Sequence, residues 1–217
     1  METIQGMPYI VLVVVVTALG LASQWYIDHA YGKWSKVPMS LGMTGADVAR
    51  RMLDGSGAAS VGITQVAGRL TDHYDPRDGR LHLSAENYGR GSVASVAVAC
   101  HEAGHAVQNA TGYAPMRLRA ALVPAVSLTS QTWWLVFMAG VMLNWAGLAQ
   151  LAVALFGVSV LFHVVTLPVE IDASMRAVRY IDGITDDPRD RQGARNVLTA
   201  AAMSYVAFAM ICALAII

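Results

Sequence analysis

Three long stretches of this chain contain no Asp, Glu, Lys or Arg, and they constrain its fold more than any other feature. They cover residues 3–27, 120–169 and 196–217. A helix that crosses a bilayer needs about 20 predominantly apolar residues. The first and third stretches therefore predict one crossing each. The middle stretch is long enough for two crossings joined by a tight turn near residues 144–147, so the sequence predicts four transmembrane helices.

The composition agrees with a membrane protein. Hydrophobic residues make up 55% of the chain and charged residues only 14%, whereas soluble domains carry about 25% charged residues. The lipid bilayer is therefore the first predicted partner. The formal net charge is zero, which gives no reason to expect a nucleic-acid partner. The sequence also contains no Gly-rich phosphate-binding loop, so nothing indicates nucleotide-driven work.

The basic residues predict how these helices are oriented. All 15 Lys and Arg residues lie either between Lys33 and Arg119 or between Arg176 and Arg195. With four crossings, both regions share one side of the membrane. The positive-inside rule makes that side cytoplasmic and places both termini outside. The first apolar stretch lacks a preceding basic segment and is long for a signal peptide, so we expect a retained anchor.

This topology divides the chain into five parts. We expect transmembrane helix 1 (1–27), a cytoplasmic part (28–119), transmembrane helices 2 and 3 (120–169), a cytoplasmic helix or loop (170–196) and transmembrane helix 4 (197–217).

Local signals predict a small α+β arrangement inside the first cytoplasmic part. Thr44 and Ser92 are suitable N-cap residues for two helices. The segment between them contains short strand-like runs and a turn of the Asp-Pro-x-x-Gly kind. We therefore expect a short antiparallel sheet ahead of the second helix. The predicted helices cover 45–53 and 92–107, the strands 61–66, 70–74 and 80–83, and the turn 75–79.

The second helix carries the motif His101-Glu102-Ala103-Gly104-His105. Residues i and i+4 lie on one face of a helix, so both imidazoles can reach one ion. His-Glu-x-x-His is the zinc-peptidase arrangement, in which the glutamate acts on a zinc-activated water. A chance match in a chain of this length occurs roughly once in a hundred, and the alternative is a pair of buried structural histidines. The motif and the topology predict a mainly α membrane protein with four transmembrane helices and a small zincin-like cytoplasmic part.

A catalytic zinc keeps three protein ligands and one open position, so a third ligand is needed. His105 lies just before the second predicted crossing, and Glu170 and Asp172 follow the third, which returns them to the same membrane face. An acid at the bilayer boundary is costly unless it is paired or bound to a metal, which makes either acid a candidate. The alternative for Glu170 is an ion pair with Arg176 or Arg179. For Asp172, a salt bridge or a ligand-orienting role is favoured over ligation.

The sequence also resembles a known family. The segments His-Glu-Ala-Gly-His-Ala-Val-Gln, Thr-Asp-His-Tyr-Asp-Pro (71–76) and Leu-Pro-Val-Glu-Ile-Asp-Ala-Ser (167–174) are similar to those of YugP-like neutral zinc metallopeptidases of bacterial membranes. A more distant similarity is to the HtpX type of membrane peptidase. The resemblance implies Zn²⁺ as cofactor, Glu170 as its third ligand beside His101 and His105, and a place in the bacterial inner membrane. Ser174 stands where the HtpX type has an aspartate.

The reaction implied is hydrolysis of peptide bonds in a protein or peptide substrate. Glu102 would act as general base and then as general acid. An oxyanion partner is also needed, and Arg176, Arg179, Tyr180 and His73 are candidates. We also expect residues 80–83 to form an edge strand, which could pair with an extended substrate.

Two other functions remain possible from the sequence. A site-2-type intramembrane protease also carries His-Glu-x-x-His, but its Asp-Gly partner lies within a span, whereas Asp182-Gly183 lies among charged residues. A membrane scaffold with a structural zinc would need four protein ligands, and only three candidates are found. The sequence predicts neither the physiological substrate, nor endo- or exopeptidase action, nor a homo-oligomer or an accessory membrane subunit.

Overall fold

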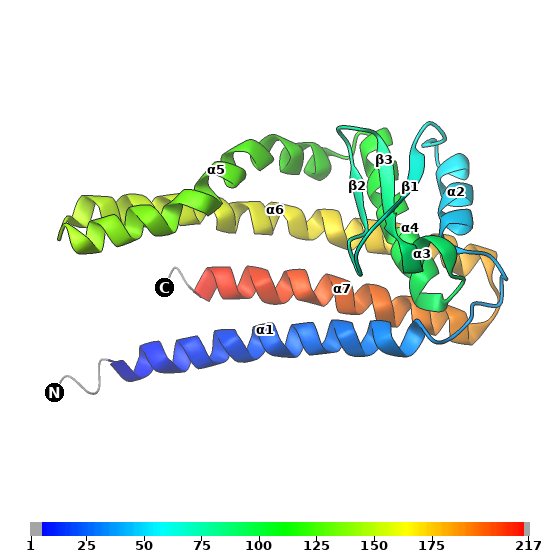
Figure 1. The fold of residues 1–217 in the computed structure, drawn as a ribbon, viewed down its shortest axis with the longest axis horizontal. Coiled ribbons are helices and arrows are strands. Elements are labelled where there is room, and N and C mark those ends of the chain that lie inside the picture. Colours follow the sequence, from blue (N-terminus) through cyan, green and yellow to red (C-terminus); the bar gives the residue numbers. More distant parts are fainter. Residues whose placement is uncertain (1–5, 215–217) are drawn as a thin grey trace. The chain divides into compact units, whose positions relative to one another are not determined.

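The structure, a computed structural model, describes residues 6–214, apart from the side chains of residues 6–9, 12, 208, 209 and 211–214. Figure 1 shows its helices and strands. In chain order they are α1 (Gly6–Trp34), α2 (Gly45–Gly55), β1 (Gly62–Val66), β2 (His73–Asp75), β3 (Arg80–Ser84), α3 (Ala85–Gly89), α4 (Val93–Ala110), α5 (Ala114–Met142), α6 (Ala146–Ile184) and α7 (Pro188–Leu214).

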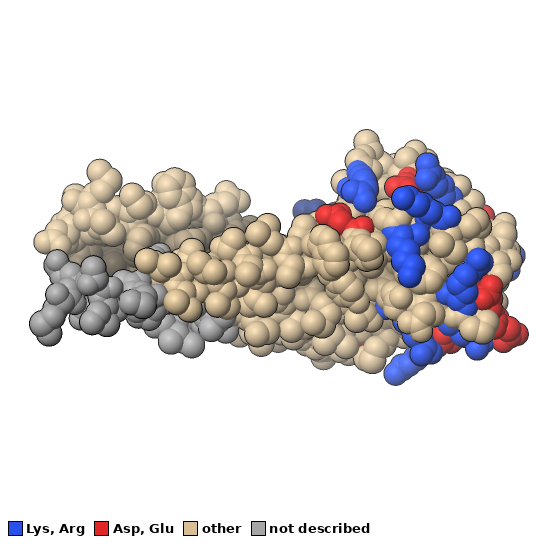
Figure 2. Space-filling view, turned by 90° about the horizontal axis from the view of Figure 1, so that it is seen from below, with Lys and Arg blue, Asp and Glu red and all other residues tan. Residues whose placement is uncertain are grey.

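The chain forms two compact units, which are described separately. The apolar unit consists of Met1–Ala22, Ala114–Pro168 and Tyr205–Ile217. The charged unit consists of Ser23–Tyr113 and Val169–Ser204. Only three charged residues of the sequence, Glu2, Arg117 and Arg119, belong to the apolar unit. On the face shown in Figure 2, the Lys, Arg, Asp and Glu side chains gather in one region.

Among the described residues, two helices are long and apolar enough to cross a membrane, α5 and α6. Their apolar side chains point outward, and Leu128 and Val153 are 68% and 54% exposed. Such a surface suits lipid better than water. The predicted turn lies between these two helices, where Asn144 adopts a left-handed backbone with φ 49°, a conformation that Asn tolerates well. Crossings by α1 and α7 stay predictions.

The charged unit is built around α4, which is buried along most of its length. Ser92 caps this helix by accepting a hydrogen bond from the Ser95 backbone N–H at 3.0 Å. Thr44 caps α2 in the same way through Asp47, whose carboxylate in turn accepts from the Thr44 backbone N–H. Both predicted N-caps are confirmed, and each satisfies donors that the first helical turn leaves unpaired.

One hydrophobic core joins α4 to the other elements of this unit. The end of α1 contributes Tyr31 and Trp34, and the beginning of α7 contributes Val197 and Leu198. Helix α2 packs along α4 with Val48, Ala49, Met52 and Leu53, all buried. The core therefore holds α4 in place from several sides.

The sheet has three strands in the order β1-β3-β2. Strands β2 and β3 form the predicted antiparallel hairpin, with His73 opposite His82. Strand β1 pairs with β3 in parallel, so the prediction of a purely antiparallel sheet is wrong. Strand β3 takes the centre because its residues Leu81 and Leu83 are both fully buried. The prediction that residues 80–83 form an edge strand is therefore also wrong, and the edges are β1 and β2.

Candidate metal centre

Three side chains from two helices converge in the charged unit. Helix α4 presents His101 and His105 one turn apart, and α6 presents Glu170. The Glu170 Oε2 atom lies 3.2 Å from His101 Nε2 and 3.4 Å from His105 Nε2. Glu170 is only 2% exposed, and both histidines are buried as well. The structure thus brings together the three residues predicted as ligands.

The convergence depends on a close approach of the two backbones at Gly104. A Cβ atom on this glycine would lie 2.8 Å from the Ala173 carbonyl oxygen and 3.1 Å from the Ala173 Cα atom. Ala173 is itself fully buried. Since α4 and α6 touch backbone to backbone at this point, Glu170 on one side of Ala173 and Ser174 on the other can both reach the histidines.

The chemistry of the three groups fits a zinc ion. Their nearest ligand atoms all lie within 4.8 Å of one another, and two imidazoles with one carboxylate are a catalytic zinc set that leaves a fourth position open. A carboxylate this deeply buried is costly unless it is paired or coordinates a metal. Within residues 6–214, no other group of three His, Cys, Asp or Glu side chains meets the same criterion.

The outer nitrogen of each histidine is also bonded. His105 Nδ1 lies 3.0 Å from Gln108 Oε1, and His101 Nδ1 lies 3.1 Å from Ser174 Oγ. Gln108 Nε2 donates to the Val169 carbonyl oxygen at 2.7 Å and to Asp172 Oδ2 at 2.8 Å.

Sequence reasoning missed Gln108 and Ser174 as partners of the histidines. The available signals were their spacings, three residues after His105 and four residues after Glu170, which place each on a helix face near a ligand. Those spacings identify partners only once the contact between α4 and α6 is known.

Glu102 lies beside His101 and next to strand β2. Its side chain is partly buried, and burial raises the pKa of its carboxyl to about 7. The negative charge of Glu170 also raises this pKa, whereas His101 and a backbone hydrogen bond from Tyr74 lower it. A carboxyl with a pKa near neutrality can both take and return a proton.

Asp72 holds the segment that leads into β2. Its carboxylate accepts from the backbone N–H and the hydroxyl of Ser84, at 2.7 and 3.0 Å, and from Asn87 Nδ2 at 2.8 Å. The Tyr31 hydroxyl of α1 donates to Asn87 Oδ1 at 2.9 Å. This network fixes β2, and with it Tyr74, next to Glu102.

The four candidate oxyanion partners have different surroundings. Arg176 donates from Nε to Asp172 Oδ2 at 2.6 Å, Arg179 is exposed, and Tyr180 is partly buried against the core. His73 stacks on His82 with the ring centroids 4.7 Å apart. Its neighbour Tyr74 reaches Asn109 of α4, so alternation along the strand points His73 away from α4.

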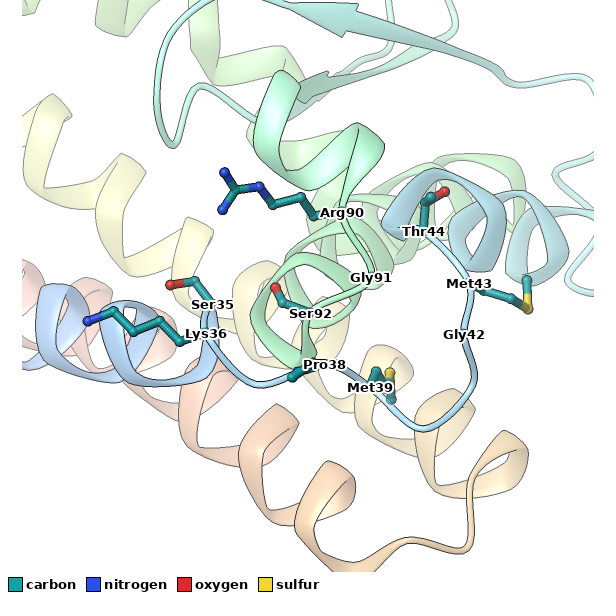
Figure 3. A pocket seen from close by; sticks show the side chains of 10 residues that line it. All are labelled: Ser35, Lys36, Pro38, Met39, Gly42, Met43, Thr44, Arg90, Gly91 and Ser92. Carbon is teal, nitrogen blue, oxygen red and sulfur yellow. The ribbon is translucent and has the colours of Figure 1, made fainter.

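A separate hollow of about 390 Å³ lies between the α1–α2 connection and the beginning of α4 (Figure 3). None of its lining residues belongs to the candidate metal centre. They are Ser35, Lys36, Pro38, Met39, Gly42, Met43, Thr44, Arg90, Gly91 and Ser92.

The chain is similar to known proteins along most of its length. A family model described as "Putative neutral zinc metallopeptidase" matches residues 9–217. Over 200 residues the chain is 40% identical to a protein named "Putative membrane protease YugP" from Bacillus subtilis (strain 168). That alignment covers 90% of this chain and 88% of the relative. No solved structure gives a significant match.

Proposed function

This chain belongs to a family of neutral zinc metallopeptidases, and on that premise we propose that it hydrolyses peptide bonds at the centre formed by His101, His105 and Glu170. Its cofactor is Zn²⁺ and its substrates are proteins or peptides. The observation that carries the proposal is the convergence of the three buried ligand atoms within 4.8 Å, with Glu102 on the same helix.

In this proposal, three residues bind the metal and a fourth transfers protons. His101 and His105 each offer Nε2, and Glu170 offers Oε2, to hold the metal. When bound, zinc supplies a Lewis acid that acidifies a water molecule and polarises the scissile carbonyl. Glu102 takes a proton from the attacking water on its carboxylate and passes that proton to the leaving amine.

The proposed place of this chemistry is the cytoplasmic face of a membrane. The relative is named a membrane protease, and α5 and α6 are apolar enough to cross a bilayer, which supports membrane association. In our proposal α1 and α7 complete four crossings, and both termini lie outside. Reporter fusions after Thr111 and after Ile217 test this: only the first should behave as cytoplasmic, and the reverse result contradicts the orientation.

A Glu102→Gln variant of the full-length chain tests the catalytic proposal. Removing the proton acceptor should lower hydrolysis of a fluorescent casein by at least about a hundredfold, while zinc content stays at one ion per chain. Asp186→Asn is the control, because Asp186 is fully exposed and pairs with Arg191 at the surface. It should leave both measurements unchanged. Hydrolysis by Glu102→Gln at the wild-type rate would remove Glu102 from the mechanism.

The same measurements separate the alternatives. A scaffold with a structural zinc would hold the metal and show no hydrolysis even in the wild-type protein. A site-2-type mechanism would need Asp182 near the metal, but this carboxylate accepts from Arg195 at 2.7 Å. In cells, new protein N-termini that appear with the wild type and not with Glu102→Gln would identify the substrates.

A further inference from the structure

We infer that Gln108 is a positioning residue that fixes the tautomer and the ring orientation of His105, and that Asp172 acts on His105 through Gln108. The inference deepens the proposed function, because it assumes the zinc centre described above. It rests on the order of donors and acceptors along one series of buried and partly buried hydrogen bonds.

The orientation of the Gln108 amide follows from its partners. One end of the amide faces the Val169 carbonyl oxygen and an Asp172 carboxylate oxygen, and both of these atoms can only accept. That end must therefore be the NH₂ group, which has two hydrogens to donate. Gln108 is fully buried, so the reverse orientation would leave acceptors facing each other away from water, at a considerable cost.

The tautomer of His105 follows from the amide. With its NH₂ end committed, Gln108 presents Oε1 to His105 Nδ1 at 3.0 Å. An amide oxygen only accepts, so Nδ1 must carry the hydrogen and the neutral ring keeps its lone pair on Nε2. Nε2 is the atom that faces Glu170. The ring is thus prepared to offer Nε2 to a metal before any metal arrives.

Asp172 and Arg176 form the end of this series of hydrogen bonds that is farthest from His105. Asp172 Oδ2 accepts from Gln108 Nε2 at 2.8 Å and from Arg176 Nε at 2.6 Å. Arg176 also lies over the Tyr113 ring, 5.9 Å from its centroid. A carboxylate held in this way keeps its oxygen aimed at the amide, so the constraint runs from Arg176 to Asp172, to Gln108 and then to His105.

His101 provides an internal comparison. Its outer partner is the Ser174 hydroxyl at 3.1 Å, which can donate or accept and so leaves the tautomer open. The hydrogen-bond partners therefore fix the tautomer of His105 but not that of His101. Partners of this kind typically change metal affinity by about 10- to 100-fold when they are removed.

Zinc affinity of the full-length protein, measured by competition with a chromophoric chelator, tests the inference without reference to hydrolysis. The variants are Gln108→Met, Asp172→Asn and the double variant. Gln108→Met should weaken zinc binding by about 10- to 100-fold and shift the visible absorption of the Co²⁺-substituted protein. Asp172→Asn should weaken zinc binding by a smaller factor. In the Gln108→Met background, Asp172→Asn should have no further effect on zinc affinity, since the amide that connects Asp172 to His105 is absent.

Gln192→Met is the matched control, because Gln192 is exposed and its side-chain amide donates to Asn196 Oδ1. It should bind zinc as the wild type does. Equal affinity of Gln108→Met and Gln192→Met overturns the inference, as does an Asp172→Asn effect of the same size in both backgrounds. If Gln108→Met does not fold, Asp172→Asn alone decides: unchanged affinity and an unchanged Co²⁺ spectrum overturn the inference. A wild-type protein that binds zinc but does not hydrolyse casein would instead contradict the proposed function.

Discussion

The α4–α6 helix pair and the three-stranded sheet belong to the same charged unit, but they differ in how their functional side chains are held. In the helix pair, Glu170 and Gln108 are buried and each contacts several fixed partners. On the sheet, His82 forms hydrogen bonds with Thr64 and Asp78 and stacks on the exposed His73. The difference supports our proposal that α4 and α6 carry the chemistry, while the sheet mainly supports Glu102 through β2.

The largest effect is expected from Gly104→Val, which places a side chain where α4 and α6 touch. The added atoms would meet the Ala173 backbone, and because backbone cannot move aside as a flexible side chain does, the helices must separate. We expect a loss of stability of at least about 1–3 kcal/mol and loss of zinc binding, measured by thermal unfolding and metal content. Gly183→Ala in the same helix pair is the control, since no atom lies within 4 Å of its Cβ position. Equal behaviour of the two variants would contradict the close approach.

The next largest effect is expected from Glu170→Gln. The substitution keeps the shape but removes the charge that faces both Nε2 atoms. Zinc affinity should fall by more than the 10- to 100-fold that is typical of losing an outer partner, as measured by chelator competition. Asp186→Asn again serves as the control. Wild-type affinity in Glu170→Gln would move the third ligand elsewhere.

A moderate effect is expected from Ser92→Ala. This change removes the N-cap of α4, where the hydroxyl accepts from the Ser95 N–H. The free energy of unfolding should fall by about 1 kcal/mol, seen as a lower midpoint of thermal unfolding, with zinc still bound. Ser60→Ala, at an exposed position, should leave the midpoint unchanged. A fall in zinc affinity with no change in the midpoint would show that Ser92 does more than cap the helix.

The smallest effect is expected from His82→Asn on the sheet. The variant loses the stacking on His73 and the hydrogen bonds to Asp78 and Thr64. His82 is half-buried, and the free energy of unfolding should fall by less than about 1 kcal/mol. Zinc affinity and casein hydrolysis should stay within about twofold of the wild type. A large loss of hydrolysis with zinc retained would show that the sheet acts on the substrate directly and does not only support Glu102.

Much of the candidate site could be predicted because its determinants are local or topological. The spacing of His101 and His105 needs only helical geometry. Glu170 could be selected because two predicted crossings would return it to the side of the membrane predicted for His105. Thr44 and Ser92 could be identified as caps from residue type and position.

The remaining features depend on tertiary contacts that leave no local pattern. The alternation within β1, β2 and β3 indicates strands but not which strands are neighbours, so the central place of β3 could not be read from Leu81 and Leu83 alone. Gln108 looks like an ordinary polar residue of a helical segment until α4 and α6 are brought together. The sequence predicts a salt bridge or an orienting role for Asp172, but it does not identify Gln108 as its partner. His73 was considered for the site on its residue type, whereas its direction is set by the strand.

The contact at Gly104 and Ala173 also matters for anyone who wishes to transplant this centre into a designed protein. Grafting the five-residue motif onto a foreign helix would carry over two imidazoles and the proposed general base. It would not bring Glu170 close to the two imidazoles, because that contact depends on the backbone of a second helix lying against position 104. The smallest transferable piece is therefore a pair of helices joined at a bare glycine, with residues 101–108 on one helix and 169–176 on the other.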